Sequence, residues 1–169
     1  MRPMRRARQA LEREDCLRIL QAASSGVLAV QGEEGYPYAV PLSFVLHQGK
    51  IYFHCAPEGH KIDAIARESR VSFCVISRDD VLPEKFTTLF ESVIVFGRAR
   101  VIREEAAMRP LLAALAEKYS PGVPGLEEEI ASSIHRMAMI ELTPERITGK
   151  ECIESVRARR TAPPASSGA

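Results

Sequence analysis

Several features that would place this sequence in a class at once are missing. It has no apolar run long enough to cross a bilayer, and its first residues, MRPMRRARQALERED, lead into charged residues instead of an apolar segment. We therefore expect a cytoplasmic protein with no membrane partner. The four cysteines, Cys16, Cys55, Cys74 and Cys152, are scattered and form no CxxC pair. This spacing indicates reduced thiols and argues against zinc-ribbon and thioredoxin-like folds.

Motifs for nucleotide binding and for acid–base catalysis are also missing. Neither GxGxxG nor GxxxxGK[ST] occurs, and the strand–helix alternation of a doubly wound fold cannot be traced. The sequence has no internal repeat, no recognisable catalytic triad and no pair of carboxylates at a suitable spacing. It therefore predicts no catalytic side chain.

Positive charge is concentrated at the two ends of the chain. Seven of the 23 lysines and arginines lie there, namely Arg2, Arg5, Arg6, Arg8, Arg157, Arg159 and Arg160. The rest of the chain has 16 basic against 22 acidic residues, which is a poor surface for nucleic acid. No aromatic residues interleave with the terminal arginines, so we expect solvated termini and no nucleic-acid partner.

Length and composition predict a single folded domain. A chain of 169 residues can bury a sizeable core, and 46% apolar with 27% charged residues is typical of a globular protein. We divide the chain into a basic N-terminal arm (1–10), a folded domain (11–153) and a tail (154–169). The tail ends in TAPPASSGA, which has nothing to bury, so we expect it to be disordered.

Apolar periodicity predicts six strands and four helices. The strands are expected at residues 26–31, 36–46, 51–55, 70–77, 91–102 and 136–144, and the helices at 11–23, 61–69, 103–119 and 127–134. Gly49 supplies the positive φ of a tight turn between the second and third strands, and Pro110 must begin or kink its helix. Because most connections are hairpins, the pattern favours an antiparallel barrel or sandwich.

Residues 54–63, HCAPEGHKID, hold the densest group of reactive side chains. A metal site is not predicted, because successive strand residues such as His54 and Cys55 point to opposite faces, and His54 with His60 would need a distant third ligand. Cys55 lacks a defined partner that would activate it as a nucleophile, and we favour a small buried thiol there.

A phosphate site suits this segment better. Pro57 and Gly59 precede a short helix, so the first backbone N–H groups and the helix dipole face whatever lies beyond the strand end. His60 and Lys61 add side-chain donors, and Lys61 adds a full positive charge. The alternative is a solvated lysine beside a histidine cap.

Pro41 interrupts the apolar run YAVPLSFV and cannot donate a hydrogen bond to a neighbouring strand. One edge of this strand must therefore be free or face something other than a strand. A planar heterocycle could pair there with the backbone of Val40, Leu42 and Ser43, and an ordinary edge strand is the alternative.

Residues 4–151 resemble a known family in the order and spacing of six segments. These are GVLAV, GYPYAVPLSFV, IYFHCAPEGHKIDAI, RVSFCV, FTTLFESVIVFGRARVI and ITGKE. This is the pyridoxamine 5'-phosphate oxidase-like, FMN-binding split-barrel family, and more narrowly its branch with the nitroimidazole-resistance proteins. The resemblance implies a mainly β fold, a six-stranded antiparallel split barrel of Greek-key type with flanking helices. It also implies a homodimer with two FMN sites in the grooves between subunits.

The resemblance assigns FMN-binding roles by matching segments. The backbone of Val40, Leu42 and Ser43 would face the isoalloxazine ring. The phosphate and ribityl end would be held by His54, Gly59, His60 and Lys61. Ser92 would complete the pocket, and Thr87, Thr88 and Glu91 would line it.

Two departures bear on the activity. The family's oxidase has a Ser-Arg-Lys cluster where this chain has Gly59-His60-Lys61, and its substrate-binding C-terminal segment is unrecognisable in VRARRTAPPASSGA. The resemblance therefore implies an FMN-dependent oxidoreductase other than the true oxidase, which reduces a small acceptor such as a nitro compound or quinone with NAD(P)H as donor. A non-catalytic carrier or sensor of flavin or haem, with His54 or His60 as axial ligand, is the alternative.

Overall fold

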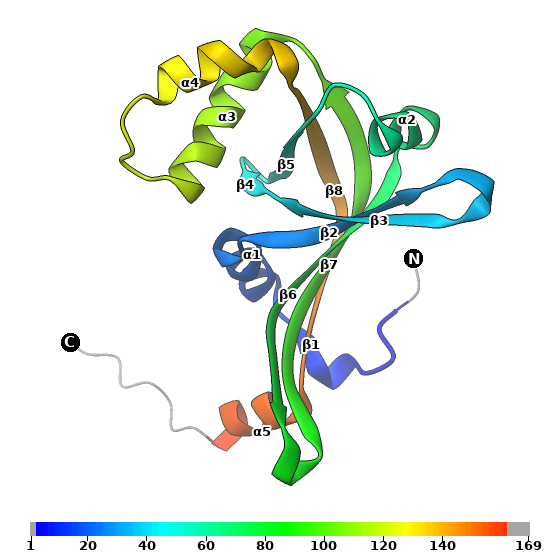
Figure 1. Ribbon diagram of the computed structural model, residues 1–169. Helices are drawn as coiled ribbons and strands as arrows, with labels where there is room; N and C mark the ends of the chain where they lie inside the picture. Colours follow the sequence, from blue (N-terminus) through cyan, green and yellow to red (C-terminus); the bar gives the residue numbers. More distant parts are fainter. Residues whose placement is uncertain (1–2, 162–169) are drawn as a thin grey trace.

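Figure 1 shows a computed structural model of the chain, which describes residues 3–161, with backbone alone for 159–161. The strands are β1 (Ala10–Leu11), β2 (Ser25–Gln31), β3 (Pro37–Ser43), β4 (Val45–His47), β5 (Lys50–Cys55), β6 (Arg70–Leu82), β7 (Thr87–Ile102) and β8 (Ala138–Glu151). The helices are α1 (Arg13–Ala22), α2 (His60–Arg67), α3 (Glu105–Tyr119), α4 (Leu126–Ser133) and α5 (Ile153–Thr161). No helix in this range is long and apolar enough to span a membrane.

The strands form one antiparallel sheet that curls into a split barrel with flanking helices, as expected. Its order is β3-β2-β6-β7-β8-β5-β4, and β1 pairs with β8. The prediction of six strands was wrong, because residues 3–161 contain eight. The expected strand at 36–46 is broken at Phe44 into β3 and β4, and the short β1 pairs with the far end of β8.

The core fills the inside of the curled sheet. Three aromatic side chains, Phe44, Phe53 and Phe73, are fully buried at its centre and pack edge to face. Apolar residues of α1 and α2, including Leu20 and Ile65, close this core. A second, smaller apolar cluster joins α3 and α4 to β4, β5 and β8. The α3–α4 pair thereby covers one end of the sheet, on the side of β4 and β5 (Figure 1).

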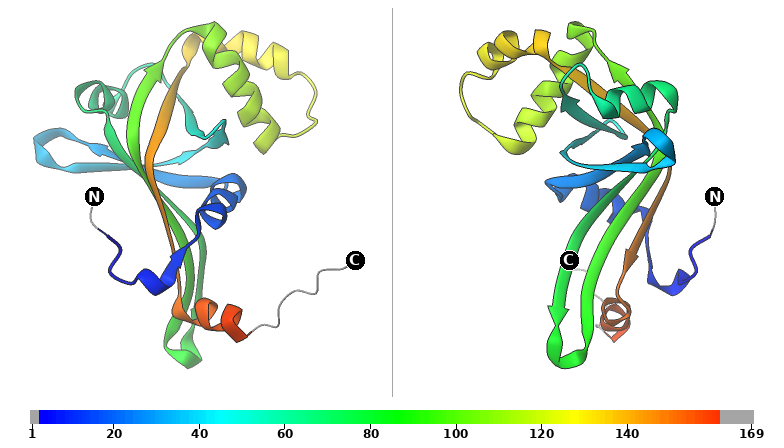
Figure 2. Two further views of the ribbon diagram at one scale, coloured as in Figure 1. Left: turned by 180° about the vertical axis from the view of Figure 1, so that it is seen from behind. Right: turned by 45° about the vertical axis from the view of Figure 1, so that its right-hand side comes forward.

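The β6–β7 hairpin extends well beyond the barrel, and α5 lies beside its distal part (Figure 2). Both strands run further than their apolar sequences predict, because the polar segments RDDVL and TTLFE continue the ladder. The Thr87 Oγ1 atom donates to Glu154 of α5 at 3.4 Å, and the Cys152 amide donates to the Phe90 carbonyl at 3.0 Å. These bonds hold the start of α5 against β7.

Two predictions about the chain ends need correction. The N-terminal arm is not free up to residue 10, because Gln9 is buried and donates through Nε2 to the Glu151 carbonyl at 3.0 Å. The predicted disordered tail is wrong for residues 154–161, which form α5. Residues 153–156 are half-buried, so this segment has something to bury, unlike the Pro- and Ser-rich sequence after it. The predicted tail at 162–169 lies outside the described residues.

Pro110 lies inside α3, five residues after its first residue. It therefore does not begin that helix, which starts with Glu105. In the first turn of α3, the amides of Ala107 and Met108 both donate to the Glu104 carbonyl at 3.0 Å.

A buried ion cluster lies on β8 outside the main core. Glu141 is only 4% exposed and accepts two hydrogen bonds from Arg100, at 2.8 and 3.1 Å. The Lys50 ammonium lies 3.0 Å away and the Tyr52 hydroxyl donates at 3.1 Å. The hydrogen bonds from Arg100 are the main cause that lowers the pKa of Glu141 from 4.5 to about 2. The cluster joins β5, β7 and β8.

Candidate functional site

Strand β3 is an edge of the sheet, as Pro41 predicted. Among the strands that the structure describes it pairs only with β2, and Pro41 stands opposite Val27 in that ladder. The side chains of Val40 and Leu42 turn inward and pack on the core, whereas Pro41 and Ser43 are exposed. The other edge of β3 therefore presents backbone groups to a ligand or to another chain.

The start of α2 has the geometry of an anion site. Gly59 precedes the helix with a φ of 119°, which favours glycine, and a Cβ placed there would meet nothing within 4 Å. Its carbonyl accepts from the amides of Ile62 and Asp63, at 2.8 and 3.1 Å. The amides of His60 and Lys61 have no acceptor within residues 3–161. Two backbone donors thus face open space at the positive end of the helix dipole.

Lys61 is the cation of this helix start, and Arg103 lies near Cys55 at the strand end before it. Lys61 is half-buried and forms no ion pair with any residue that the structure describes. Burial raises the pKa of the Cys55 thiol, while the charges of Lys61 and Arg103 oppose that rise. Both cations therefore lie close enough to Cys55 to act on it, and the raised pKa suits a packing role for the thiol. Arg103 was missed by sequence reasoning, although its position just after β7 is a signal.

His60 is held by an aromatic contact. Its ring stacks on that of Tyr38 in β3, with centroids 4.2 Å apart and planes 14° apart. Gly32 lies against the same ring, since a Cβ built on it would come 3.5 Å from His60 Nε2. The stack therefore connects the edge strand to the helix start.

His54 lies elsewhere, in a cavity of about 270 Å³ between the sheet and the α3–α4 pair. The cavity also contains Ser43, the last residue of β3. Its other lining residues come from the α3–α4 region and are mostly apolar: Leu112, Leu115, Ala116, Tyr119, Leu126, Glu129, Ile130, Ser133 and Met137. The prediction that His54 and His60 share one phosphate site does not account for this cavity, which has no wall from α2.

The sheet carries an exposed apolar area on its convex side, which we call the outer sheet face. Val27, Ile76, Ile94 and Phe96 are 40%, 66%, 39% and 39% exposed and belong to β2, β6 and β7. Val27 and Ile94 both stand opposite Cys74, so the three share a face. Ser92 lies on the same face, opposite Ile76 and Lys150. Val93 and Val95 point into the core instead.

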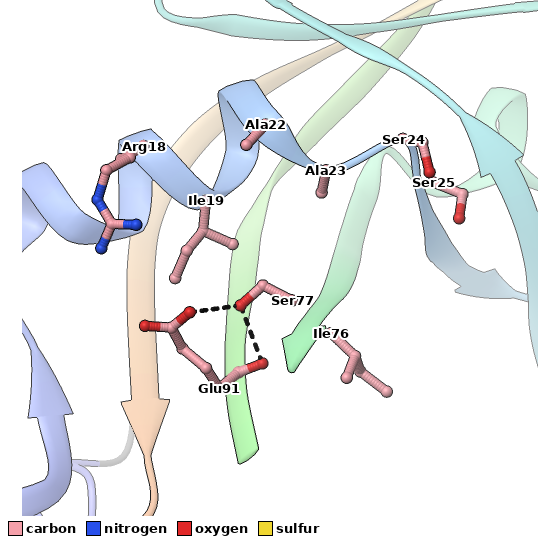
Figure 3. Close-up of a pocket in the computed structure, with 9 residues that line it drawn as sticks. All are labelled: Arg18, Ile19, Ala22, Ala23, Ser24, Ser25, Ile76, Ser77 and Glu91. Atoms are coloured by element: carbon pink, nitrogen blue, oxygen red, sulfur yellow. Dashed lines mark hydrogen bonds between the residues drawn. The ribbon is translucent and has the colours of Figure 1, made fainter. Parts of the chain in front are cut away.

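Glu91 lies in a separate open pocket of about 460 Å³ between α1 and the β6–β7 hairpin (Figure 3). The Ser77 hydroxyl donates to the Glu91 carboxylate at 2.7 Å and lies 3.2 Å from its carbonyl oxygen. Arg18 of α1 reaches the same pocket. Thr88 is further along the hairpin, in a shallow pocket with Thr87 and Phe86.

The predicted FMN residues thus fall into distinct groups on one chain. Gly59, His60 and Lys61 come together, and so do Ser43 and His54. Ser92, Glu91 and Thr88 lie on the β6–β7 side, away from both groups. Within residues 3–161 no three side chains of the types that bind metals are grouped together.

Comparison with known proteins identifies the family of this chain. The family model described as pyridoxamine 5'-phosphate oxidase matches residues 12–151. The chain belongs to this family. A comparison with curated proteins gave no significant match.

Solved structures with the same fold include several flavin-binding proteins. A candidate 5-nitroimidazole antibiotic resistance protein from Bacteroides thetaiotaomicron superposes with a TM-score of 0.73 at 19% identity, over 84% of this chain and 86% of that one. The flavocytochrome Anf3 from Azotobacter vinelandii gives 0.75 at 22%, over 89% and 72%. An FAD and haem binding protein from Mycobacterium smegmatis gives 0.72 at 20%, over 89% and 80%. These likenesses establish the shared fold.

Proposed function

We propose that this family member is a cytoplasmic flavoprotein that binds FMN and reduces a small organic acceptor of the nitro or quinone type. The observation that carries the proposal is the start of α2, where two unpaired amides and the unpaired Lys61 surround open space beside Gly59. A phosphate group satisfies such a set of donors. The flavin-binding relatives add weight to a flavin over other phosphate ligands.

The chain's own residues would hold the two ends of the cofactor. The amides of His60 and Lys61, with the Lys61 ammonium, would bind the phosphate. The free edge of β3 would offer backbone groups to the ring system. Because Pro41 cannot donate to β2, the groups that face this edge belong to alternate residues, Ala39, Pro41 and Ser43, while those of Val40 and Leu42 face β2. When bound, FMN would carry electrons from NAD(P)H to the acceptor, so no protein nucleophile is needed. FMN is preferred to FAD because a single phosphate suffices for this one group of donors.

We also propose that the site is completed by a second copy of the chain. The outer sheet face is apolar enough to be covered in an assembly. Ser92 lies on that face rather than beside Lys61. A homodimer formed through β7 and its neighbours would bring Ser92 of one subunit toward the β3 edge of the other, as the split-barrel resemblance implies.

The absorbance spectrum of the purified protein tests the cofactor first. We expect the two bands of oxidised flavin, and release of FMN rather than FAD on denaturation. A sharp Soret band without flavin bands would favour the haem-binding alternative and overturn the proposal. Bleaching of the flavin bands by NADPH, followed by steady turnover with a quinone, then separates an oxidoreductase from a carrier.

A further inference from the structure

The cavity that contains His54 is unexplained by the phosphate site. Its floor is formed by β3 and β5, through Ser43 and His54, and its roof by α3 and α4. The roof is mostly aliphatic, with Leu112 and Leu115 from α3 and Ile130 from α4. These three side chains are buried, so the lining belongs to the second core cluster and is firmly packed.

Five of the eleven lining residues carry polar groups: Ser43, His54, Tyr119, Glu129 and Ser133. Ser133 and Tyr119 already donate to backbone carbonyls, those of Glu129 and of Ser24 or Phe44. The His54 ring, by contrast, has no hydrogen-bond partner within the described residues and is exposed. Its ring N–H is therefore free to donate to a ligand. The Glu129 carboxylate in the wall disfavours anionic ligands such as a phosphate ester.

The roof is tied to the edge strand where the flavin ring is proposed to bind. The Lys118 ammonium, at the end of α3, donates to the carbonyls of Ala23 and Phe44 at 2.6 and 2.9 Å and lies 4.0 Å above the Phe44 ring. The Tyr119 hydroxyl accepts from the Phe44 amide at 2.9 Å. Phe44 directly follows Ser43, so the cavity opens beside the end of the β3 edge.

We propose that this cavity binds the electron acceptor, and that the acceptor is a neutral, planar quinone of one or two rings. The aliphatic roof fits the ring faces, and His54 donates to one carbonyl oxygen. At about 270 Å³ the cavity is just below the usual range for drug-sized ligands, roughly 300 to 1,000 Å³, and too small for haem. This inference rests on the proposed flavin function, because it places the acceptor beside the cofactor edge. Reduction would consume one quinone, one NAD(P)H and one proton, and yield the hydroquinone and NAD(P)⁺.

The experiment measures binding without turnover. Duroquinone is the probe, because its fully substituted ring does not alkylate cysteines, and equilibrium dialysis against the FMN-loaded protein without NAD(P)H gives its Kd. Ala116→Leu on α3 fills the cavity, since Ala116 lines it. Leu126→Phe fills it from α4. The control is Ala106→Leu, an exposed position on the same helix α3 that does not line the cavity.

We expect both filling variants to bind duroquinone at least tenfold more weakly than the parent. Ala106→Leu should bind duroquinone like the parent, and the Kd for FMN should be the same in all four proteins. Parent-like quinone binding in both filling variants would overturn the cavity inference and leave the flavin function standing. Failure of the parent to bind FMN would overturn the proposed function. Dialysis of the apo-protein, run in parallel, tests the cavity in that case as well. Thermal unfolding shows whether each variant is folded, and two filling variants on different helices guard against one failing to fold.

Discussion

The imidazole of His60 stacks on the phenol ring of Tyr38, with ring centroids 4.2 Å apart. Tyr38 belongs to the edge strand β3, and His60 is the first residue of α2. The contact therefore couples the two elements that would hold the opposite ends of a flavin. An ion pair between Arg67 and Glu33, at 3.6 Å, connects the other end of α2 to the β2–β3 turn. Helix α2 thus contacts this hairpin at both ends.

Replacing Lys61 should weaken FMN binding without unfolding the protein. Lys61→Ala removes one charge-assisted contact, worth about 1.5 to 3 kcal/mol, which corresponds to roughly a tenfold to hundredfold rise in Kd. Quenching of flavin fluorescence during titration of the apo-protein measures this.

Two further variants serve as controls for that result. Lys85→Ala, in the exposed turn at the tip of the β6–β7 hairpin, removes the same charge far from α2 and should bind FMN like the parent. Cys55→Ser should also change the affinity little, since the thiol packs rather than reacts. A Lys61→Ala variant that binds as tightly as the parent would show that the anion site lies elsewhere.

The stack on Tyr38 can be tested with a matched pair of substitutions. Tyr38→Ala removes the ring that orients His60, and an aromatic contact of this kind is worth about 0.5 to 1.5 kcal/mol. We therefore expect FMN affinity to fall by roughly twofold to tenfold. Tyr38→Phe keeps the stacked ring and should bind like the parent. Equal loss in both variants would mean that the hydroxyl, and not the stack, matters, and calorimetric titration with FMN distinguishes the two.

The buried carboxylate on β8 should dominate acid sensitivity. Glu141→Gln removes the charge of a buried carboxylate that accepts from Arg100, Lys50 and Tyr52. Because the Arg100 and Lys50 side chains are themselves 64% and 39% exposed, the loss is that of charge-assisted hydrogen bonds, about 1.5 to 3 kcal/mol in the free energy of unfolding. Because the folded-state pKa of Glu141 is lowered to about 2, its stabilisation is fully present above pH 4.5 and is lost as the pH falls toward 2. Urea unfolding at several pH values should therefore show the parent and variant converging in acid.

The same strand offers a control for this prediction. Glu145 pairs with Arg98 at 2.9 Å, but both side chains are largely exposed. Glu145→Gln should change the free energy of unfolding by less than about 1 kcal/mol. A larger loss from Glu145→Gln than from Glu141→Gln would contradict the assignment of the buried cluster.

The outer sheet face should be the subunit interface. Phe96→Glu places a charge on this face, and we expect sedimentation to change from dimer to monomer at micromolar concentration, with weaker FMN binding. Val123→Glu, on a more exposed loop between α3 and α4, should remain dimeric. A parent protein that sediments as a monomer with full FMN occupancy would rule out the interface.

Much of the fold could be predicted from local sequence patterns. The β2 segment, the turn at Gln48 and Gly49, and the helix after Gly59 follow from β-branched alternation, positive-φ glycine and helical spacing. The extension of β6 and β7 could not be predicted, because Arg78, Asp79 and Asp80 are polar and gain their structure only from pairing with β7. The break between β3 and β4 at Phe44 could not be predicted for a similar reason. The position of Phe44 depends on a hydrogen bond to Tyr119, 75 residues away.

The site was only partly accessible to the same reasoning. His54 and His60 are six residues apart, yet one is on a strand facing the α3–α4 cavity and the other begins a helix against Tyr38. Sequence proximity suggested one site, whereas the strand end between them sends the two side chains to different places. The cavity roof comes from residues 112–137, and no local pattern connects those helices to His54.

Phe44 limits how the length of this chain can vary. It is the single residue between β3 and β4, which stand at the two opposite ends of the sheet order. Inserting or deleting one residue here would reverse the inward and outward faces of one of the two strands. Reversal of β3 would expose Val40 and Leu42 and bury Ser43, and reversal of β4 would expose Val45. The turn at Glu33–Gly35 is exposed and joins two paired strands, so it can accept an added residue without shifting either edge. Natural variants and engineered fusions of this chain should therefore differ in length at the β2–β3 turn and keep a one-residue link at Phe44.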